Sequence, residues 1–274
     1  MIGSSFIGME VANCLASKSN SVSVVGMEEY PLQRVMGDRV GQIFQKQLEK
    51  NGVTFYMSSG VEKATPATSD SSKVGAVHLK GSTVLPADLV ILGVGVAPAT
   101  EFLRDNPAVT LEKDGSLRTN ERFAVEGLEH VYAVGDIATY PYHGPGGNGT
   151  PTRIEHWNVA QNAGRSVGFQ IATGSHKPKQ FIPVFWSALG SQLRYCGNTV
   201  NGFDELIMQG KPEEGSWAAF YTKDEDVIAV ATMGMDPVMS KSAELMRRLK
   251  MPSKSELKAG ANVLEVSLPS EIKI

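Results

Sequence analysis

The sequence predicts an α/β protein in which a region of alternating strands and helices is followed by a second region of short strands. Up to about residue 97, apolar runs alternate with segments of helical periodicity, a pattern that favours a parallel sheet with crossover helices. Beyond about residue 177, short strand-like runs lead into a helix, which is typical of a separate α+β domain. The chain of 274 residues is long enough for more than one hydrophobic core.

The first region begins with a remnant of a strand, a tight turn and a helix. The expected apolar face of that helix consists of Ile7, Val11, Cys14 and Leu15. Strands are expected at residues 22–25, 53–57 and 88–92, and a hairpin around Gly81 at residues 73–85. A second helix ends at Asn51-Gly52, and its apolar face consists of Val40, Ile43, Phe44, Gln47 and Leu48.

The rest of the chain has a weaker pattern. Between residues 98 and 178 we expect a short helix at 100–103, a strand at 131–134, a mobile Pro/Gly-rich loop at 140–152 and a long helix from about Trp157. Strands are expected at residues 192–196, 205–209, 217–222 and 226–231. Asp236-Pro237 has the residue types of an N-cap and a first helical position, and the tail after Lys250 is expected to be weakly structured.

Composition excludes several classes of function. The formal charge of −3 provides no basic face, so nucleic acid and anionic membranes are not expected partners. No apolar run approaches the roughly 20 residues of a membrane span. Cys14 and Cys196 are far apart and neither belongs to a C-x-x-C pair, so we expect two buried, inert thiols and no redox-active dithiol.

The segment Gly3-x-Ser5-x-x-Gly8 has the spacing of a dinucleotide fingerprint. Gly3 permits a tight turn, Ser5 lets a pyrophosphate approach the backbone, and Gly8 lets the helix pack closely. The alternative is an ordinary Gly-rich turn. Glu28 lies at about the distance expected for a carboxylate that binds a ribose. No Arg directly follows the strand at 22–25, which favours NADH over NADPH, although Gly26 occupies the usual position of the acid.

A second signal is Gly135-Asp136, which follows the strand expected at 131–134. A strand that ends in Gly-Asp can place a carboxylate where it accepts hydrogen bonds from a polyol hydroxyl. The alternative is that Asp136 merely caps the next helix.

These motifs resemble a known family. The fingerprint at 3–8, the run at 93–98 and the segment at 132–138 occur together, in this order, in the two-dinucleotide flavoprotein reductases of the pyridine nucleotide-disulfide oxidoreductase superfamily. The segments at 183–187, 193–197, 220–222 and 229–231 resemble the C-terminal domain of apoptosis-inducing factor-like (type 3) proteins and bacterial ferredoxin reductases.

The resemblance implies three domains. Residues 1–97 would form a Rossmann-like NAD(H)-binding domain, residues 98–178 the C-terminal part of an FAD-binding domain, and residues 179–274 the reductase C-terminal α+β domain. A first Gly-rich fingerprint, which binds the FAD pyrophosphate in the family, would lie ahead of this sequence, and the first strand of the NAD domain is reduced to Met1-Ile2. We therefore expect a truncated chain; the alternative is a form that cannot hold FAD firmly.

The resemblance also implies roles for individual residues. Gly3, Ser5, Gly8, Glu28 and Gly95 would bind NADH, and Glu10 would lie near the nicotinamide. Gly135 and Asp136 would bind the ribityl chain of FAD; Glu155, His156 and Trp157 would begin the helix that faces the flavin, and Trp186 would lie near it. Glu10 and Trp157 are the residues expected to act in catalysis. The alternative for Trp157 and Trp186 is packing in the core.

The implied function is an FAD-dependent NAD(P)H oxidoreductase that passes electrons from NADH through flavin to an iron–sulfur protein or a quinone-type acceptor. A Rieske iron–sulfur domain in the same chain is a possible acceptor in this branch; its Cys and His pairs are absent from this sequence, and no metal site is expected. Two alternatives stay open, a redox-switched interaction protein and an inactive NAD-binding remnant. The resemblance implies a cytoplasmic or mitochondrial location and leaves the oligomeric state open.

Overall fold

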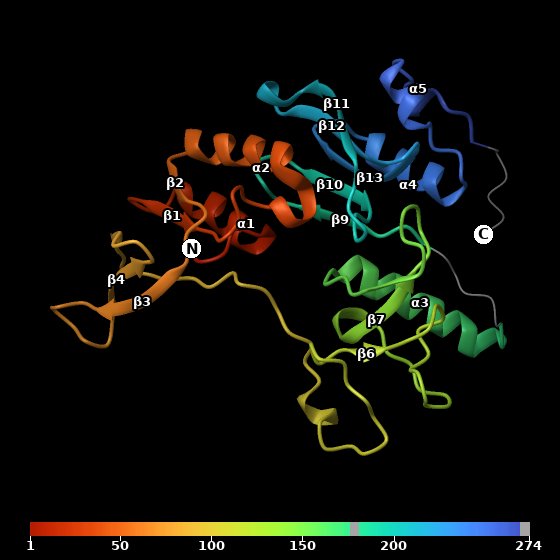
Figure 1. Ribbon diagram of the computed structural model, residues 1–274, viewed down its shortest axis with the longest axis horizontal. Helices are drawn as coiled ribbons and strands as arrows, with labels where there is room; N and C mark the ends of the chain where they lie inside the picture. Colours follow the sequence, from red (N-terminus) through yellow and green to blue (C-terminus); the bar gives the residue numbers. More distant parts are fainter. Residues whose placement is uncertain (176–180, 269–274) are drawn as a thin grey trace. The chain divides into compact units, whose positions relative to one another are not determined.

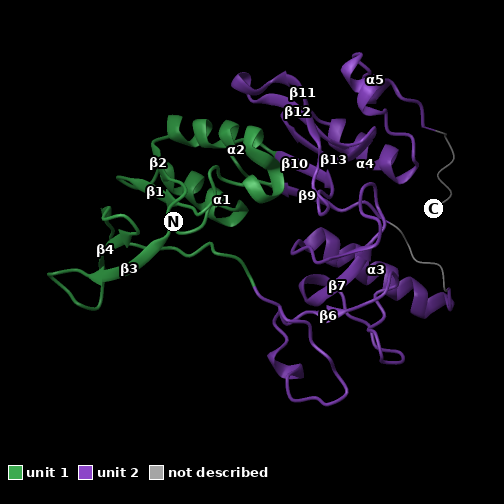
Figure 2. Cartoon of the chain, viewed as in Figure 1, with its two compact units in different colours: residues 1–96, 187–192 green, residues 97–186, 193–274 purple. Residues whose placement is uncertain are grey.

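The computed structural model describes residues 1–175 and 181–268 and has the mixed α/β architecture expected from the sequence (Figure 1). The chain divides into two compact units (Figure 2). Unit 1 contains residues 1–96 and 187–192, and unit 2 contains residues 97–186 and 193–274.

Unit 1 contains the parallel sheet that the sequence predicts. The helices α1 (Phe6–Ala16) and α2 (Gln33–Lys50) alternate with the strands β1 (Val22–Val25) and β2 (Val53–Tyr56). β1 and β2 are parallel, with Val22 opposite Val53. Ile2 adds single parallel bridges to Val25 and to Leu92, so it lies between β1 and the segment that contains Leu92.

The helix α1 forms where expected, but its predicted apolar face is wrong. Ile7 is 57% exposed and Cys14 is exposed, whereas Gly8, Met9 and Ala12 are buried. The orientation is set by Gly8, which packs against the backbone of the preceding turn and brings its own side of the helix inward. Hydrophobic periodicity alone does not predict this contact, because glycine has no side chain that would contribute to an apolar face.

The second helix and the hairpin are confirmed. Val40, Phe44 and Leu48 are buried along α2, which ends at the C-cap Asn51 and at Gly52 with φ +87°. β4 (Val74–Leu79) and β5 (Val84–Pro86) form the expected antiparallel pair, to which the structure adds β3 (Val61–Pro66).

The strand predicted at residues 88–92 forms only the bridge at Leu92. Leu89 and Leu92 are 68% and 66% exposed, which is unusual for an apolar run of this kind. A strand is defined by its hydrogen bonds to neighbours, and most of this segment has none on either side among the described residues.

The first part of unit 2 is irregular apart from one long helix. Its elements are η1 (Glu101–Leu103), β6 (Leu117–Arg118), η2 (Gly135–Ile137), β7 (Ala138–Tyr142), β8 (Thr150–Thr152) and α3 (Trp157–Thr173). The helix from Trp157 is confirmed. The strand expected at 131–134 is wrong, since it is reduced to a bridge between Ala124 and Tyr132. The helix expected at 100–103 is the single 3₁₀ turn η1.

The Pro/Gly-rich segment at 140–152 is more ordered than predicted. Its two ends are the paired strands β7 and β8, with Tyr140 opposite Thr152. The Asn201 side-chain amide donates to the carbonyl oxygens of Gly146 and Gly147 at 2.9 and 3.0 Å. The expectation of a free surface loop is therefore wrong for most of this segment.

The second part of unit 2 contains an antiparallel sheet in the order β11-β12-β13-β10-β9, with α4 packed against it (Figure 1). The elements are β9 (Val184–Ser187), whose last residue belongs to unit 1, β10 (Leu193–Gly197), β11 (Glu205–Lys211), η3 (Pro212–Glu214), β12 (Ser216–Lys223), β13 (Asp226–Met233), α4 (Val238–Arg247), α5 (Lys254–Lys258) and η4 (Val263–Glu265). The four predicted strands are all present. Phe220 and Val230 are fully buried where the sheet meets Leu245 of α4.

Two details of this region differ from the prediction. Asp236 does not cap α4; the N-cap is Pro237, and the Asp236 carboxylate pairs with Arg194 at 2.8 Å. Residues 251–268 are structured, contrary to the prediction, and Ser253 and Glu256 form a capping box at the start of α5. Leu257 and Val263 anchor this segment in the core.

Candidate nucleotide and flavin sites

The turn at the start of unit 1 is built from three interlocked glycines. Gly3 has φ +103°, and a Cβ atom on it would lie 2.2 Å from the Gly93 carbonyl oxygen. A Cβ on Gly8 would lie 2.2 Å from the Gly3 carbonyl oxygen, and one on Gly93 would lie 3.1 Å from the Gly8 Cα. The contacts at Gly3 and Gly8 leave no room for a side chain, and the contact at Gly93 is tight. The backbone of the turn is therefore held against both the start of α1 and the segment at residue 93.

An open pocket of about 310 Å³ lies beside this turn. Among its lining residues are the predicted Gly3, Ser5, Glu28 and Gly95. Ser5 is the N-cap of α1, makes no side-chain capping hydrogen bond and is exposed, and the first turn of the helix has no acidic residue. A helix end of this kind favours an anion through its backbone N–H groups and its dipole.

Gly95 lies at the pocket with a backbone that suits a ligand contact. Its φ is +105°, and a Cβ on it would meet nothing within 4 Å. Close packing therefore does not explain why glycine occupies this position. Its positive φ and the open space beside it explain the choice. The arrangement leaves its backbone accessible from the pocket.

Glu28 is held in place at the pocket. Its carboxylate accepts from the Ser4 hydroxyl at 3.3 Å and pairs with the Arg34 guanidinium at 2.6 Å. Its side chain is 21% exposed, whereas that of Arg34 is 78% exposed. A Cβ on Gly26 would lie 2.5 Å from the Ser4 hydroxyl oxygen, so no larger residue fits at this position, and the acid Glu28 follows two positions after Gly26.

Glu10 does not line this pocket. Its carboxylate accepts hydrogen bonds from the Ser187 hydroxyl and from the Ala188 backbone N–H, the latter at 3.1 Å. All three residues belong to unit 1, because the segment 187–192 is part of it. Two donors fix the position of this carboxylate.

In unit 2, Arg153 links the predicted residues Asp136 and Glu155. Its guanidinium donates to the Asp136 carbonyl oxygen at 3.3 Å and pairs with the Glu155 carboxylate at 2.8 Å and with Asp114 at 3.1 Å. Gly135 has φ +77° and begins η2. The Asp136 carboxylate is exposed and does not cap a helix, since the N-cap of η2 is Val134. The capping alternative is therefore wrong.

His156, Trp157 and Trp186 form an aromatic cluster. The rings of Trp157 and Trp186 meet edge to face with centroids 4.8 Å apart, and His156 meets Trp186 at 5.3 Å. His156 is the N-cap of α3, and its side chain accepts from the Asn158 backbone N–H. The two tryptophans are 52% and 42% exposed, so core packing does not account for them. Large exposed aromatic surfaces next to a helix N-terminus are suited to stacking on a ligand.

Sequence reasoning missed Arg34, Arg153 and Ser187. Arg34 lies on α2, well beyond the strand end where a phosphate-binding Arg was sought, and its approach to Glu28 depends on the loop at residues 26–32. Ser187 reaches Glu10 across 177 positions of sequence. No local signal could have paired these residues.

Two other expectations concern the cysteines and metals. Cys14 is exposed, contrary to prediction, whereas Cys196 is buried and burial raises the pKa of its thiol to about 12. Within residues 1–175 and 181–268, no cluster of three or more His, Cys, Asp or Glu side chains could hold a metal ion. None of the described helices is long and apolar enough to cross a membrane.

Comparison with known proteins agrees with this architecture. Residues 1–164 match the pyridine nucleotide-disulphide oxidoreductase family, and residues 184–265 match the reductase C-terminal family. Apoptosis-inducing factor 3 from Mus musculus is 40% identical over 247 residues, which cover 90% of this chain and 39% of that protein. The chain thus spans about two fifths of the length of this relative.

Solved structures show the same fold. A ferredoxin reductase from Rhodopseudomonas palustris is 25% identical with a TM-score of 0.83, covering 95% of this chain and 64% of that one. A covalent complex of putidaredoxin reductase with putidaredoxin gives 26% identity and a TM-score of 0.83, covering 93% of this chain and 59% of that one. The chain therefore belongs to the pyridine nucleotide-disulphide oxidoreductase family.

Proposed function

We propose that this protein is part of an FAD-dependent NAD(P)H oxidoreductase that passes electrons from NADH to an iron–sulfur protein. The observation that carries the proposal is the interlocked turn of Gly3, Gly8 and Gly93 beside an open pocket at the start of α1. We assign residues 1–97 to NADH binding, residues 98–178 to the remainder of an FAD-binding domain and residues 179–274 to the reductase C-terminal domain.

The pocket in unit 1 suits a dinucleotide. Its pyrophosphate would lie at the start of α1, against Ser5, where the helix end carries partial positive charge. The Glu28 carboxylate would accept hydrogen bonds from the ribose hydroxyls, and Gly95 would present its backbone. Glu28 would also repel a 2′-phosphate, which favours NADH. Arg34 partly offsets that repulsion, so the preference depends on the balance between these two side chains.

Glu10 would define the nicotinamide end of the site. Its position is fixed by Ser187 and Ala188, so it enters the site as an oriented carboxylate rather than a mobile one. A fixed acceptor can hold the carboxamide of a nicotinamide, which presents two N–H donors, and so orient the ring.

The residues present in unit 2 fit part of an FAD molecule. The exposed Asp136 carboxylate, which follows Gly135, would accept from the ribityl hydroxyls. The start of α3 at Glu155, His156 and Trp157 would face the ring edge, where backbone N–H groups stabilise negative charge. Trp186 would cover the ring beside Trp157. When bound, the flavin accepts a hydride and releases single electrons, chemistry that the protein itself cannot supply.

The acceptor is proposed from the named relatives. One relative, from Sphingomonas sp., is a ferredoxin–NAD(P)(+) reductase with 30% identity over 234 residues, and one structural neighbour is a reductase joined to putidaredoxin. These names support an iron–sulfur acceptor over a quinone. An acceptor domain in the same chain and the cytoplasmic or mitochondrial location stay predictions from the resemblance.

The test begins with NADH and no flavin. Titration of the purified chain with NADH, followed by calorimetry, should give saturable binding to one site. The variant Gly95→Ala probes the pocket backbone, because its added methyl group meets nothing within 4 Å, while the strain of alanine at φ +105° should lower the thermal stability. Weaker NADH binding by a variant that stays folded would support the site. Equal binding by wild type and variant would exclude Gly95 from it, and no binding by either would contradict the NADH assignment.

Flavin binding is measured separately. The chain is incubated with FAD, desalted and examined by visible spectroscopy, and NADH is then added without oxygen. A retained flavin band that bleaches would establish reductase activity in this chain. Absence of retained flavin would restrict the proposal to a longer chain, whereas retained flavin that NADH does not bleach would contradict it.

A further inference from the structure

Met27 is an exposed methionine at the nucleotide pocket of unit 1. All eleven methionines of the chain lie within the described residues, and only Met27, which is 75% exposed, is not buried or half-buried. Met9 and Met36 of the same unit are fully buried. Methionine ordinarily fills gaps in hydrophobic cores, so an exposed methionine beside a binding pocket has another explanation.

The backbone on both sides of Met27 is fixed. On one side, the Gly26 carbonyl oxygen accepts from the Ser59 N–H at 2.9 Å. On the other side, the Glu28 carbonyl oxygen accepts from the Ser58 N–H at 2.8 Å. The exposure of Met27 is therefore not that of a free loop, and the position of its side chain relative to the pocket is set by the fold.

The pocket around Met27 offers apolar surface next to the carboxylate proposed to bind a ribose. Met27, Val35 and Val94 line the pocket, and the two valines are 36% and 67% exposed. Glu28 directly follows Met27 in the chain. In NADH the adenine base is attached to the ribose that Glu28 would bind, so the base would lie within reach of the Met27 thioether. Thioethers make favourable contacts with aromatic rings.

The thioether of Met27 can also be oxidised. Among the residues that line the pocket, Met27 is the one that contains sulfur. Hydrogen peroxide transfers one oxygen atom to the sulfur, which gives up two electrons and becomes a sulfoxide. The O–O bond of the peroxide breaks, and the second oxygen atom leaves as water. The sulfoxide is polar, so its contact with an apolar base carries a desolvation cost that the thioether does not have.

We propose that Met27 is a site of reversible oxidation that controls coenzyme binding. The inference rests on the NADH site proposed above. In the thioether form Met27 covers the adenine base, whereas the sulfoxide form binds NADH about fivefold more weakly. Methionine sulfoxide reductases restore the thioether by supplying two electrons from thiols and releasing the oxygen as water. The protein would thus take up less NADH while peroxide is abundant.

The first measurement locates the oxidation. The purified chain is treated with hydrogen peroxide for increasing times and digested, and mass spectrometry follows the sulfoxide at each methionine. Met27 should react at least about tenfold faster than the buried Met9 and Met36, because oxidation follows exposure. This measurement needs no coenzyme, so it tests the modification independently of the proposed function.

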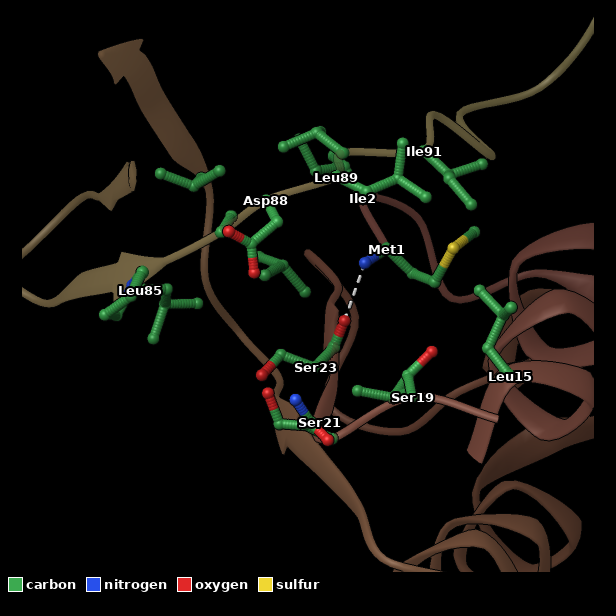
Figure 3. Close-up of a pocket in the computed structure, with 17 residues that line it drawn as sticks. Met1, Ile2, Leu15, Ser19, Ser21, Ser23, Leu85, Asp88, Leu89 and Ile91 are labelled. Atoms are coloured by element: carbon green, nitrogen blue, oxygen red, sulfur yellow. Dashed lines mark hydrogen bonds between the residues drawn. The ribbon is translucent and has the colours of Figure 1, made fainter. Parts of the chain in front are cut away.

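The second measurement adds saturating NADH before the peroxide. Bound adenine should cover Met27 and slow its oxidation about threefold or more. Met1 provides the internal reference, because it is half-buried and lines a separate cavity of about 220 Å³ in the same unit (Figure 3). Its rate of oxidation should be the same with and without NADH.

The third measurement titrates NADH by calorimetry before and after oxidation. The original chain should lose about fivefold in affinity, and the two methionine sulfoxide reductases, one for each epimer, should restore it. Met27→Leu keeps an apolar side chain of similar size without the sulfur, so its affinity should be the same before and after peroxide. Met57→Leu is the matched control. Met57 is half-buried in the same unit and lies outside the lining of the pocket, so this variant should lose affinity as the original chain does.

Three results would overturn the proposal: oxidation of Met27 no faster than that of Met9, oxidation of Met27 that leaves the NADH affinity unchanged, or a loss of affinity in Met27→Leu equal to that of the original chain. A chain that binds no NADH before oxidation would contradict the proposed coenzyme site and this inference with it. NADH binding that is insensitive to the oxidation of Met27 would contradict this inference alone.

Discussion

Replacement of Gly8 by alanine sets two effects of known size against each other. Alanine is favoured over glycine inside a helix by ~1 kcal/mol, so α1 alone would gain stability. The new Cβ, however, would lie 2.2 Å from the Gly3 carbonyl oxygen and 3.1 Å from its carbon. Ordinary contacts between carbon and oxygen begin at about 3.3 Å, so α1 must move away from the turn by about 1 Å.

The cost of the steric clash should exceed the gain in helix propensity. Both atoms in contact belong to backbone, so no flexible side chain can yield, and the turn is also held by Gly93. Overpacking costs about 1–3 kcal/mol and can cost more where the neighbours are rigid. Because both contacting groups are rigid, we place the cost at about 2–3 kcal/mol, so Gly8→Ala should destabilise unit 1 by about 1–2 kcal/mol after the gain in helix propensity. It should also weaken NADH binding because the turn moves.

Gly168 in α3 offers a matched control. It is exposed, and a Cβ on it would meet nothing within 4 Å, so Gly168→Ala should stabilise its helix by about 0.5–1 kcal/mol. Hydrogen exchange read by mass spectrometry measures the opening of α1 and α3 separately in both variants. The reasoning from the close contact is refuted if Gly8→Ala slows exchange in α1 as Gly168→Ala is expected to do in α3.

Further predictions concern coenzyme preference, acid stability and thiol reactivity. Glu28→Gln should weaken NADH binding about tenfold and improve the binding of NADPH relative to NADH, because Arg34 loses its carboxylate partner. Calorimetric titration with both coenzymes measures the two affinities, and an unchanged preference would contradict the prediction. The hydrogen bond from Arg247 lowers the pKa of Glu244 from 4.5 to about 2. The stability that Glu244 contributes is therefore complete above about pH 4.5 and is lost as the pH falls towards 2. Glu244→Gln should lower the free energy of unfolding in urea by about 1 kcal/mol at neutral pH and leave it unchanged near pH 2. A difference that stays constant with pH would refute the pairing. Iodoacetamide at neutral pH should modify the exposed Cys14 and leave Cys196 unmodified, because burial raises the pKa of the Cys196 thiol to about 12. Mass spectrometry of the peptides measures both reactions, and equal modification of the two cysteines would disprove the prediction.

Much of the fold could be predicted wherever a local signal decides the structure. The stop at Asn51-Gly52 was predictable because Gly52 takes a positive φ that ends a helix. The helix α5 after Lys250 also has a local signal, since Ser253 and Glu256 have the spacing of a capping box. The strand β3 was missed because only one of its six residues is strongly apolar and β-branched and it ends in proline.

The candidate site divides in the same way. The turn at Gly3, Ser5 and Gly8 could be predicted because a tight turn and a close helix require small residues at a fixed spacing. The residues that position charges were not found. Arg153 reaches Asp136 and Glu155, and Ser187 reaches Glu10, through contacts that only the folded chain creates. The spacing of residues in the sequence predicts the structure of a single helix, strand or turn, but not which of these elements contact one another.

The two mispredicted strands show the limit most clearly. Residues 88–92 and 131–134 have apolar patterns as strong as that of β1, yet each forms only one bridge. Their exposed Leu89 and Val131 show that the pattern encodes a buried place between neighbours, and the neighbours among the described residues do not supply it.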